Sequence, residues 1–214
     1  MSESTPPAIL NRMKSALKSP DIPAPMEESR EAFPVLISTI ISLRTRDAVT
    51  RMVSRQVLKK TPDVDAMISI DRAELEQLLR PAGFYRQKAG QMKRIAEILK
   101  SDFEGRVPDS MESLLSLPGV GRKTANFVMG MVFGVPSICV DVHVHRISNR
   151  LGLVDTRSPD ETEFALQRLF PKSEWTEINH LMVRFGQKIC RPTKPLCSEC
   201  PLRDQCPSGI QVNG

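Results

Sequence analysis

The sequence predicts an all-α protein, because apolar residues recur mostly at helical spacing and alternating β-branched runs are scarce. The chain has 214 residues, enough for one large or two small domains with hydrophobic cores. Hydrophobic residues make up 40% and charged residues 26%, which is typical of a folded globular protein rather than a disordered one. Together, the helical spacing, the length and the composition predict a globular protein of one or two helical domains, without a β-sheet.

The predicted helices follow one another along the chain as far as residue 189. Pro34–Leu43 reads as a buried helix with proline at its first position. Thr45 is expected to cap the next helix, near Arg46–Lys60, and Asp71 precedes a short one. The remaining predicted helices are Phe84–Lys100, Met111–Ser116, Thr124–Val132, Val144–Leu151, Thr162–Phe170 and Glu174–Ile189. Beyond this point, cysteine, proline and charged residues replace the helical pattern.

The charge balance is basic, with 30 Lys and Arg against 25 Asp and Glu and a pI near 9.1. A basic protein suits a polyanionic partner. The predicted helix Phe84–Lys100 combines an apolar stripe with basic residues that include Arg86, Lys88, Lys93 and Arg94. No apolar run reaches the roughly 18 residues of a membrane span, and the N-terminus lacks a secretory apolar core. We therefore expect an intracellular protein of the cytoplasm or nucleoid, without a membrane partner. Disulfides rarely persist in such a reducing compartment.

Residues 117–121 (LPGVG) lie between two predicted helices and are followed by an Arg-Lys pair. The two glycines allow a sharp turn that exposes backbone N–H groups, while the leucine and valine can anchor the turn in the core. Because a helix begins here, its unpaired N–H groups and positive dipole end form a phosphate site. An ordinary interhelical turn is the alternative; the flanking helices and basic pair favour a helix-hairpin-helix that grips the DNA backbone. Its predicted DNA contacts are Leu117, Gly119, Val120, Gly121 and Arg122.

Four of the five cysteines form the pattern C-x6-C-x2-C-x5-C in a proline-rich segment: Cys190, Cys197, Cys200 and Cys206. Zinc normally takes two close cysteine pairs. One close pair with a wider step on each side fits a cubane iron–sulfur cluster better. Structural disulfides are the remaining alternative, disfavoured in a reducing compartment. Cys139 follows an apolar run and is predicted to lie in the core.

Together these features make the chain resemble the endonuclease III family of helix-hairpin-helix DNA glycosylases, from about Pro34 to Cys206. The resemblance rests on LPGVGRKTAN (117–126), VDVHVHRISNRLGLV (140–154) and the four-cysteine pattern. It implies a [4Fe-4S] cluster on the four cysteines and two α-helical domains flanking a DNA-binding cleft. One would be a six-helix barrel, residues 24–135, and the other a cluster domain of residues 1–23 and 136–214. We expect a monomer that binds double-stranded DNA containing damaged bases or abasic sites.

The resemblance also implies two catalytic residues. Lys123 in GRKTAN matches the family's catalytic lysine, and Asp141 in VDVH matches its catalytic aspartate. A lysine amine can attack C1′ of a flipped nucleotide and expel the base, after which the Schiff base makes the C2′ proton acidic and β-elimination breaks the strand. A carboxylate can stabilise positive charge on the sugar and assist proton transfer. The alternatives are a phosphate contact for Lys123 and a helix N-cap for Asp141.

Two positions depart from the family pattern. Arg44 stands where the family usually has a glutamine that fills the gap left by the flipped base, and Phe84 stands where it often has a leucine wedge. Because an arginine fork matches the guanine edge, we predict that Arg44 reads an estranged base, with a phosphate contact as the equal alternative. These changes affect lesion preference and opposite-base discrimination rather than lyase chemistry. We also expect the cluster to hold the loop Arg191–Leu196 so that Lys194 meets phosphate.

The implied function is a bifunctional DNA glycosylase and AP lyase of base excision repair, acting on damaged pyrimidines and above all on oxidised ones. An adenine-mismatch glycosylase generally lacks the catalytic lysine and carries an extra C-terminal domain. A thymine-mismatch glycosylase typically has tyrosine where Lys123 stands. A non-catalytic iron–sulfur protein that binds DNA or senses redox state would not need Lys123 and Asp141 together.

Overall fold

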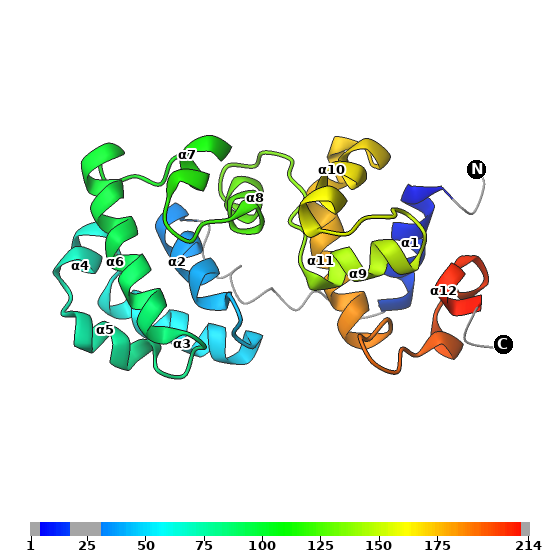
Figure 1. Ribbon diagram of the computed structural model, residues 1–214, viewed down its shortest axis with the longest axis horizontal. Helices are drawn as coiled ribbons and strands as arrows, with labels where there is room; N and C mark the ends of the chain where they lie inside the picture. The colour runs from blue at the N-terminus through cyan, green and yellow to red at the C-terminus, as the bar shows by residue number, and fades with distance from the viewer. Residues whose placement is uncertain (1–4, 18–30, 211–214) are drawn as a thin grey trace. The chain divides into compact units, whose positions relative to one another are not determined.

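The computed structural model describes residues 5–17 and 31–210, and every regular element within these ranges is helical (Figure 1). The prediction of an all-α protein is therefore confirmed. In this part of the chain no helix is long and apolar enough to cross a membrane. Contacts divide the described residues into two compact units, one of residues 31–135 and one of residues 5–17 and 136–210. The predicted domain boundary between residues 23 and 24 lies outside the described residues.

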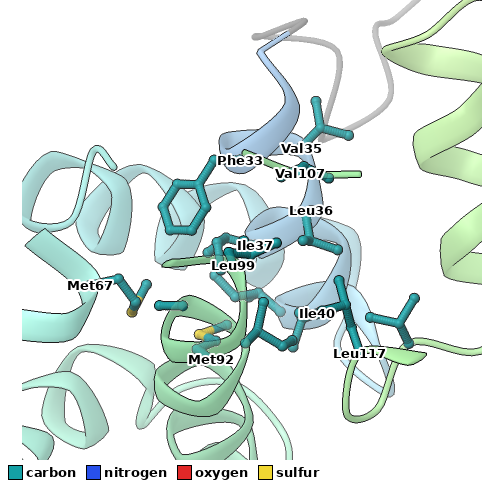
Figure 2. Packing of buried hydrophobic residues seen from close by; sticks show 14 of the residues in the cluster. Phe33, Val35, Leu36, Ile37, Ile40, Met67, Met92, Leu99, Val107 and Leu117 are labelled. Atoms are coloured by element: carbon teal, nitrogen blue, oxygen red, sulfur yellow. The ribbon is translucent and has the colours of Figure 1, made fainter. Parts of the chain in front are cut away.

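The unit of residues 31–135 is built around α2 and α6. Its helices are α2 (Ala32–Ser42), α3 (Asp47–Lys60), α4 (Val64–Ser69), α5 (Arg72–Leu79), α6 (Tyr85–Asp102), α7 (Met111–Ser116) and α8 (Arg122–Met131). The helix α2 is apolar on all sides and almost wholly buried, so other helices must surround it. Figure 2 shows Phe33, Ile37 and Ile40 of α2 together with Met92 and Leu99 of α6 in this core.

The structure differs from the prediction at the beginnings of α2 and α3. The helix α2 begins at Ala32, two residues before the predicted start, so Pro34 is its third residue rather than its first. Proline is tolerated there because N–H groups of the first turn have no intrahelical partner. Thr45 does not cap α3, whose N-cap is Arg46; its hydroxyl donates to the carbonyl of Leu43 at 3.3 Å instead.

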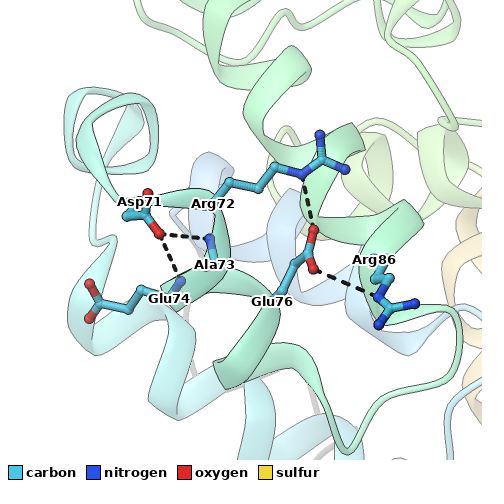
Figure 3. A network of polar contacts seen from close by, with 6 residues as sticks. All are labelled: Asp71, Arg72, Ala73, Glu74, Glu76 and Arg86. Carbon is cyan, nitrogen blue, oxygen red and sulfur yellow. Dashed lines mark hydrogen bonds and ion pairs between the residues drawn. The ribbon is translucent and has the colours of Figure 1, made fainter.

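Asp71 caps α5 as predicted. Its Oδ1 accepts hydrogen bonds from the N–H groups of Ala73 and Glu74, at 2.8 and 3.2 Å (Figure 3). Within the same network, Glu76 pairs with Arg72 at 3.0 Å and with Arg86 of α6 at 3.9 Å. These contacts fix the corner between α5 and α6, where Phe84 lies.

The other unit contains α1 (Pro6–Leu17), α9 (Val142–Arg150), α10 (Pro159–Leu169), η1 (Lys172–Glu174), α11 (Trp175–Lys188), η2 (Cys197–Glu199), η3 (Arg203–Gln205) and α12 (Pro207–Ile210). The amphipathic helix α11 packs against α9 and against α1 from the other end of the sequence. Leu10, Met13 and Phe185 are almost completely buried in this second core. Cys139 is also buried, as predicted.

Candidate functional site

The turn between α7 and α8 has the geometry of a backbone-binding hairpin. Leu117 and Val120 are only 2% and 5% exposed, and the N–H of Val120 donates to the carbonyl of Leu117 at 3.1 Å. Gly119 has φ of 74°, a left-handed conformation that glycine adopts without steric cost. Gly121 is the N-cap of α8 and has no side-chain oxygen to cap the helix. The beginning of α8 therefore suits an outside anion such as phosphate.

Lys123 is the second residue of α8 and is exposed. It follows Arg122, which is partly exposed at the first helical position. Because the N-terminus of a helix carries partial positive charge, this basic pair and the helix end attract the same anion. The hairpin therefore presents an accessible amine next to a site suited to the DNA backbone.

Asp141 is the N-cap of α9, in the other unit. Its Oδ1 accepts hydrogen bonds from the N–H groups of His143 and Val144, both at 2.9 Å. The alternative of a helix N-cap is thus realised in the structure. The second carboxylate oxygen accepts no hydrogen bond within the described residues. One oxygen orients the side chain while the other is available for a substrate, so capping and catalysis are compatible roles for Asp141.

The structure brings together Arg44 and Phe84, which are 40 residues apart in the sequence. The guanidinium carbon of Arg44 lies 5.1 Å from the centre of the Phe84 ring, a cation–π contact. Arg44 is in the turn after α2, and Phe84 is the N-cap of α6 and 56% exposed. Their φ angles of 53° and 59° are left-handed, which costs a non-glycine residue about 1–2 kcal/mol. We call these two residues the Arg44–Phe84 pair.

Lys88, on α6, contacts the residues on both sides of Arg44. It is only 3% exposed, and its Nζ donates hydrogen bonds to the carbonyls of Ile41 and Leu43, both at 2.7 Å, and to Thr45 Oγ1 at 2.8 Å. Burial lowers the pKa of Lys88 to about 8. Lys88 and the Arg44–Phe84 pair line one cavity of about 380 Å³. Sequence reasoning missed this role, although Lys88 lies four residues before the buried Met92 and therefore on the apolar stripe of α6.

The four predicted cluster ligands, Cys190, Cys197, Cys200 and Cys206, line one cavity of about 280 Å³. All four are free cysteines in the structure, which therefore contains none of the disulfides of that alternative. Among the described residues, no three His, Cys, Asp or Glu side chains are placed to hold a single metal ion. A zinc ion with thiolates at 2.3 Å would bring the sulfur atoms to about 3.8 Å from each other. A cavity lined by all four cysteines suits a larger inorganic group.

Two arginines of α9 hold the cysteine segment. Arg150 donates to the carbonyls of Arg191 and Pro192 at 2.7 and 2.9 Å and approaches Cys190 Sγ at 3.6 Å. Arg146 donates to the carbonyl of Cys190 at 2.9 Å. Burial raises the pKa of the Cys200 and Cys206 thiols. Thiolates at these two positions therefore need a positive partner, which a metal cluster supplies.

Lys194 lies in the loop that follows Cys190. It is exposed, and its φ of 50° is left-handed. Of the four non-glycine residues with positive φ in the described chain, three are predicted DNA contacts: Arg44, Phe84 and Lys194. Strained backbone of this kind tends to gather at functional sites, which supports their selection as contacts.

The all-α fold, the N–H-rich hairpin and the cavity lined by four cysteines fit a helix-hairpin-helix DNA-repair protein. Residues 37–172 match the family model of the HhH-GPD superfamily base excision DNA repair proteins. The chain is 49% identical to endonuclease III of Thermotoga maritima over 176 residues, covering 82% of this chain and 83% of that protein. It is 41% identical to endonuclease III homolog 2, chloroplastic, of Arabidopsis thaliana, covering 87% of this chain and 50% of that longer protein.

Comparison with solved structures indicates the same family as the sequence relatives. The chain matches a trapped covalent intermediate of endonuclease III with DNA, an estranged-adenine complex, with a TM-score of 0.91, 34% identity and full coverage of both chains. The protein therefore belongs to the endonuclease III family of base excision repair DNA glycosylases.

Proposed function

We propose that this protein is a bifunctional glycosylase and AP lyase that removes oxidised pyrimidines from double-stranded DNA and then cuts the strand through a Schiff base on Lys123. The observation that carries this proposal is the exposed Lys123 in the first turn of α8, directly after the glycine N-cap of the hairpin. The hairpin holds the backbone of the damaged strand, and the adjacent amine reaches the sugar of a flipped nucleotide.

The Lys123 amine acts as the nucleophile. Its nitrogen forms a bond to C1′, and the glycosidic bond breaks with its electron pair leaving on the damaged base, which takes up a proton. Opening of the sugar ring gives a Schiff base between Lys123 and C1′. The positive nitrogen makes the C2′ proton acidic, and loss of that proton expels the 3′ phosphate by β-elimination.

Asp141 supports the charged intermediates. Its carboxylate stabilises positive charge on the sugar and assists proton transfer, and the cap bonds to His143 and Val144 keep its orientation fixed. Preorganised groups of this kind stabilise a transition state without reorganising during the reaction.

The four cysteines would hold a [4Fe-4S] cluster in the cavity that they line. The cluster would supply structural support and take no part in base release or strand cleavage. Arg146 and Arg150 bind the backbone at both ends of the Cys190–Pro192 segment, so the chain around the cavity is fixed from α9. We infer that this arrangement presents Lys194 to a phosphate of the DNA.

The Arg44–Phe84 pair would face the space left by the flipped nucleotide. Both side chains are exposed and stacked on each other. Phe84 offers an aromatic surface that can stack against a base, and Arg44 offers donors that can pair with the estranged base of the opposite strand.

Single-turnover assays on matched duplexes test the function. The substrates contain thymine glycol, 5-hydroxyuracil, uracil, an abasic site, a T·G mismatch or an A·G mismatch. We expect base release from the first two, followed by strand cleavage, and cleavage at the abasic site. Release of only mismatched thymine or adenine would replace this proposal by a mismatch glycosylase. DNA binding without base release or cleavage on any duplex would indicate a non-catalytic protein.

A further inference from the structure

A buried lysine connects the two turns that carry Arg44 and Phe84. Lysine is rarely buried unless its charge is satisfied. The three N–H groups of the Lys88 ammonium meet three acceptors, the carbonyls of Ile41 and Leu43 and the hydroxyl of Thr45. Since its pKa is about 8, Lys88 is mostly protonated at neutral pH and has all three donors available.

The acceptors of Lys88 lie on both sides of Arg44. Leu43 precedes Arg44 and Thr45 follows it, so the ammonium holds the backbone before this residue and the side chain after it. Arg44 has a left-handed φ, which persists only where its surroundings enforce it. The hydrogen bonds of Lys88 hold the turn after α2 and so stabilise the left-handed φ of Arg44. The carbonyls at the end of α2 also carry partial negative charge, which favours a nearby cation.

Lys88 belongs at the same time to the turn of Phe84. It lies in the first turn of α6, and its backbone N–H donates to the carbonyl of Phe84 at 3.0 Å. The two turns are also in backbone contact, because a Cβ added at Gly83 would lie 2.7 Å from the carbonyl oxygen of Arg44. Lys88, this close approach and the stacked side chains therefore join the two turns in three ways.

We propose that Lys88 is a positioning residue, which fixes the two turns as one rigid unit and so presets the orientation of Arg44 towards the estranged base. This inference rests on the proposed function of the Arg44–Phe84 pair. A pair that is rigid before binding loses less conformational freedom when it enters DNA. Removing Lys88 should then slow base release through Arg44, although the Lys88 side chain is almost completely buried.

The same helix provides a matched control. Lys93 of α6 donates to the carbonyls of Ile68 and Ile70 at 2.6 and 2.5 Å, at the end of α4. Neither acceptor lies next to a predicted DNA contact. Like Lys88→Met, Lys93→Met removes hydrogen bonds from a lysine ammonium of α6 to two backbone carbonyls. It tests whether any loosening of α6 has the same effect.

The experiment is a double-mutant cycle on single-turnover base release from a thymine glycol duplex, with guanine or adenine opposite the lesion. Lys88→Met should slow release about tenfold in the wild-type background, within the coupling range of contacting residues, but less than about twofold in Arg44→Gln. Lys93→Met should change the rate less than about twofold in either background. Equal effects of Lys88→Met in both backgrounds, or equal effects of the two lysine variants, would overturn the proposal.

Two further measurements keep the outcome decisive. If circular dichroism shows that Lys88→Met does not fold, Gly83→Ala replaces it, because its new Cβ pushes directly against Arg44. Gly83→Ala should show the same coupling to Arg44→Gln, and independent effects would contradict the proposal. If the wild type binds DNA but releases no base, the proposed function fails; the cycle is then read from dissociation constants, which test the coupling separately.

Discussion

Replacing Asp141 by asparagine should slow base release about tenfold or more while lowering the free energy of unfolding by no more than about 1 kcal/mol. In the structure, Oδ1 of Asp141 accepts two hydrogen bonds from N–H groups of α9, both at 2.9 Å. Asparagine keeps an oxygen in this position and is an equally good N-cap. The variant loses only the negative charge at the helix N-terminus, worth about 0.3–1 kcal/mol. A tenfold slower reaction corresponds to about 1.4 kcal/mol of lost transition-state stabilisation.

Asp141→Ala removes both the charge and the cap. Losing an N-cap costs about 0.5–2 kcal/mol, so this variant should lower the free energy of unfolding as well as the rate. Asp71 is the matched control, because it caps α5 with the same geometry, at 2.8 and 3.2 Å (Figure 3). Asp71→Asn and Asp71→Ala should repeat the two stability changes without altering base release.

The assays are single-turnover release of thymine glycol and urea unfolding of all four variants. A wild-type rate in Asp141→Asn would leave Asp141 as a helix cap only. An equal loss of rate in Asp71→Asn would show that a lost capping charge slows the enzyme in general, and it would refute the assignment of Asp141.

Three further predictions concern the cluster, Arg44 and Lys88. The purified protein should be brown, with a broad absorption at about 400 nm, and should contain iron and sulfide. Arg44→Gln should change the ratio of excision rates opposite guanine and opposite adenine about fivefold or more, since a bidentate contact discriminates by about 1–3 kcal/mol. The pKa of Lys88 in the folded state, about 8, is below the usual lysine value of 10.5, so the penalty of burying the ammonium is full below pH 8 and is relieved as pH rises towards 10.5. The free energy of unfolding of the wild type should therefore rise relative to Lys88→Met in this window, by at most about 3 kcal/mol.

Each of these has a clear contrary result. Stoichiometric zinc after gentle purification would exclude the iron–sulfur cluster. If Arg44 contacts phosphate instead, Arg44→Gln will weaken binding to all duplexes alike and reduce the salt dependence by about one ion. A difference in unfolding free energy between wild type and Lys88→Met that stays constant from pH 7 to pH 10.5 would contradict the lowered pKa of Lys88.

The sequence predicted the helices whose apolar faces are long enough to show a period. The helix predicted at Met111–Ser116 has the same limits as α7, and in the structure Ser110 caps it. No helix was predicted at α4, a helix of six residues in which Val64 and Met67 are buried. Thr45 was assigned wrongly as a cap, since its hydroxyl is engaged by Leu43 and by Lys88 of a distant helix.

In the candidate site, features that are local in sequence were predicted, whereas contacts between distant residues were not. The hairpin and the cysteine segment are local in sequence, so spacing alone indicates their chemistry. The stacking of Arg44 on Phe84 and the burial of Lys88 depend on contacts over 40 to 47 residues. Such contacts follow from how α2 and α6 pack, which residue patterns within either helix do not specify.

Borohydride trapping on a duplex with an abasic site tests the central claim most directly. Reduction of the Schiff base leaves a stable covalent link, which mass spectrometry of the digested complex assigns to one residue. We predict that the adduct lies on Lys123 and that Lys123→Gln forms none while still binding the duplex. Trapping of Lys123→Gln at the wild-type level, or an adduct on another amine of the wild type, would contradict the account.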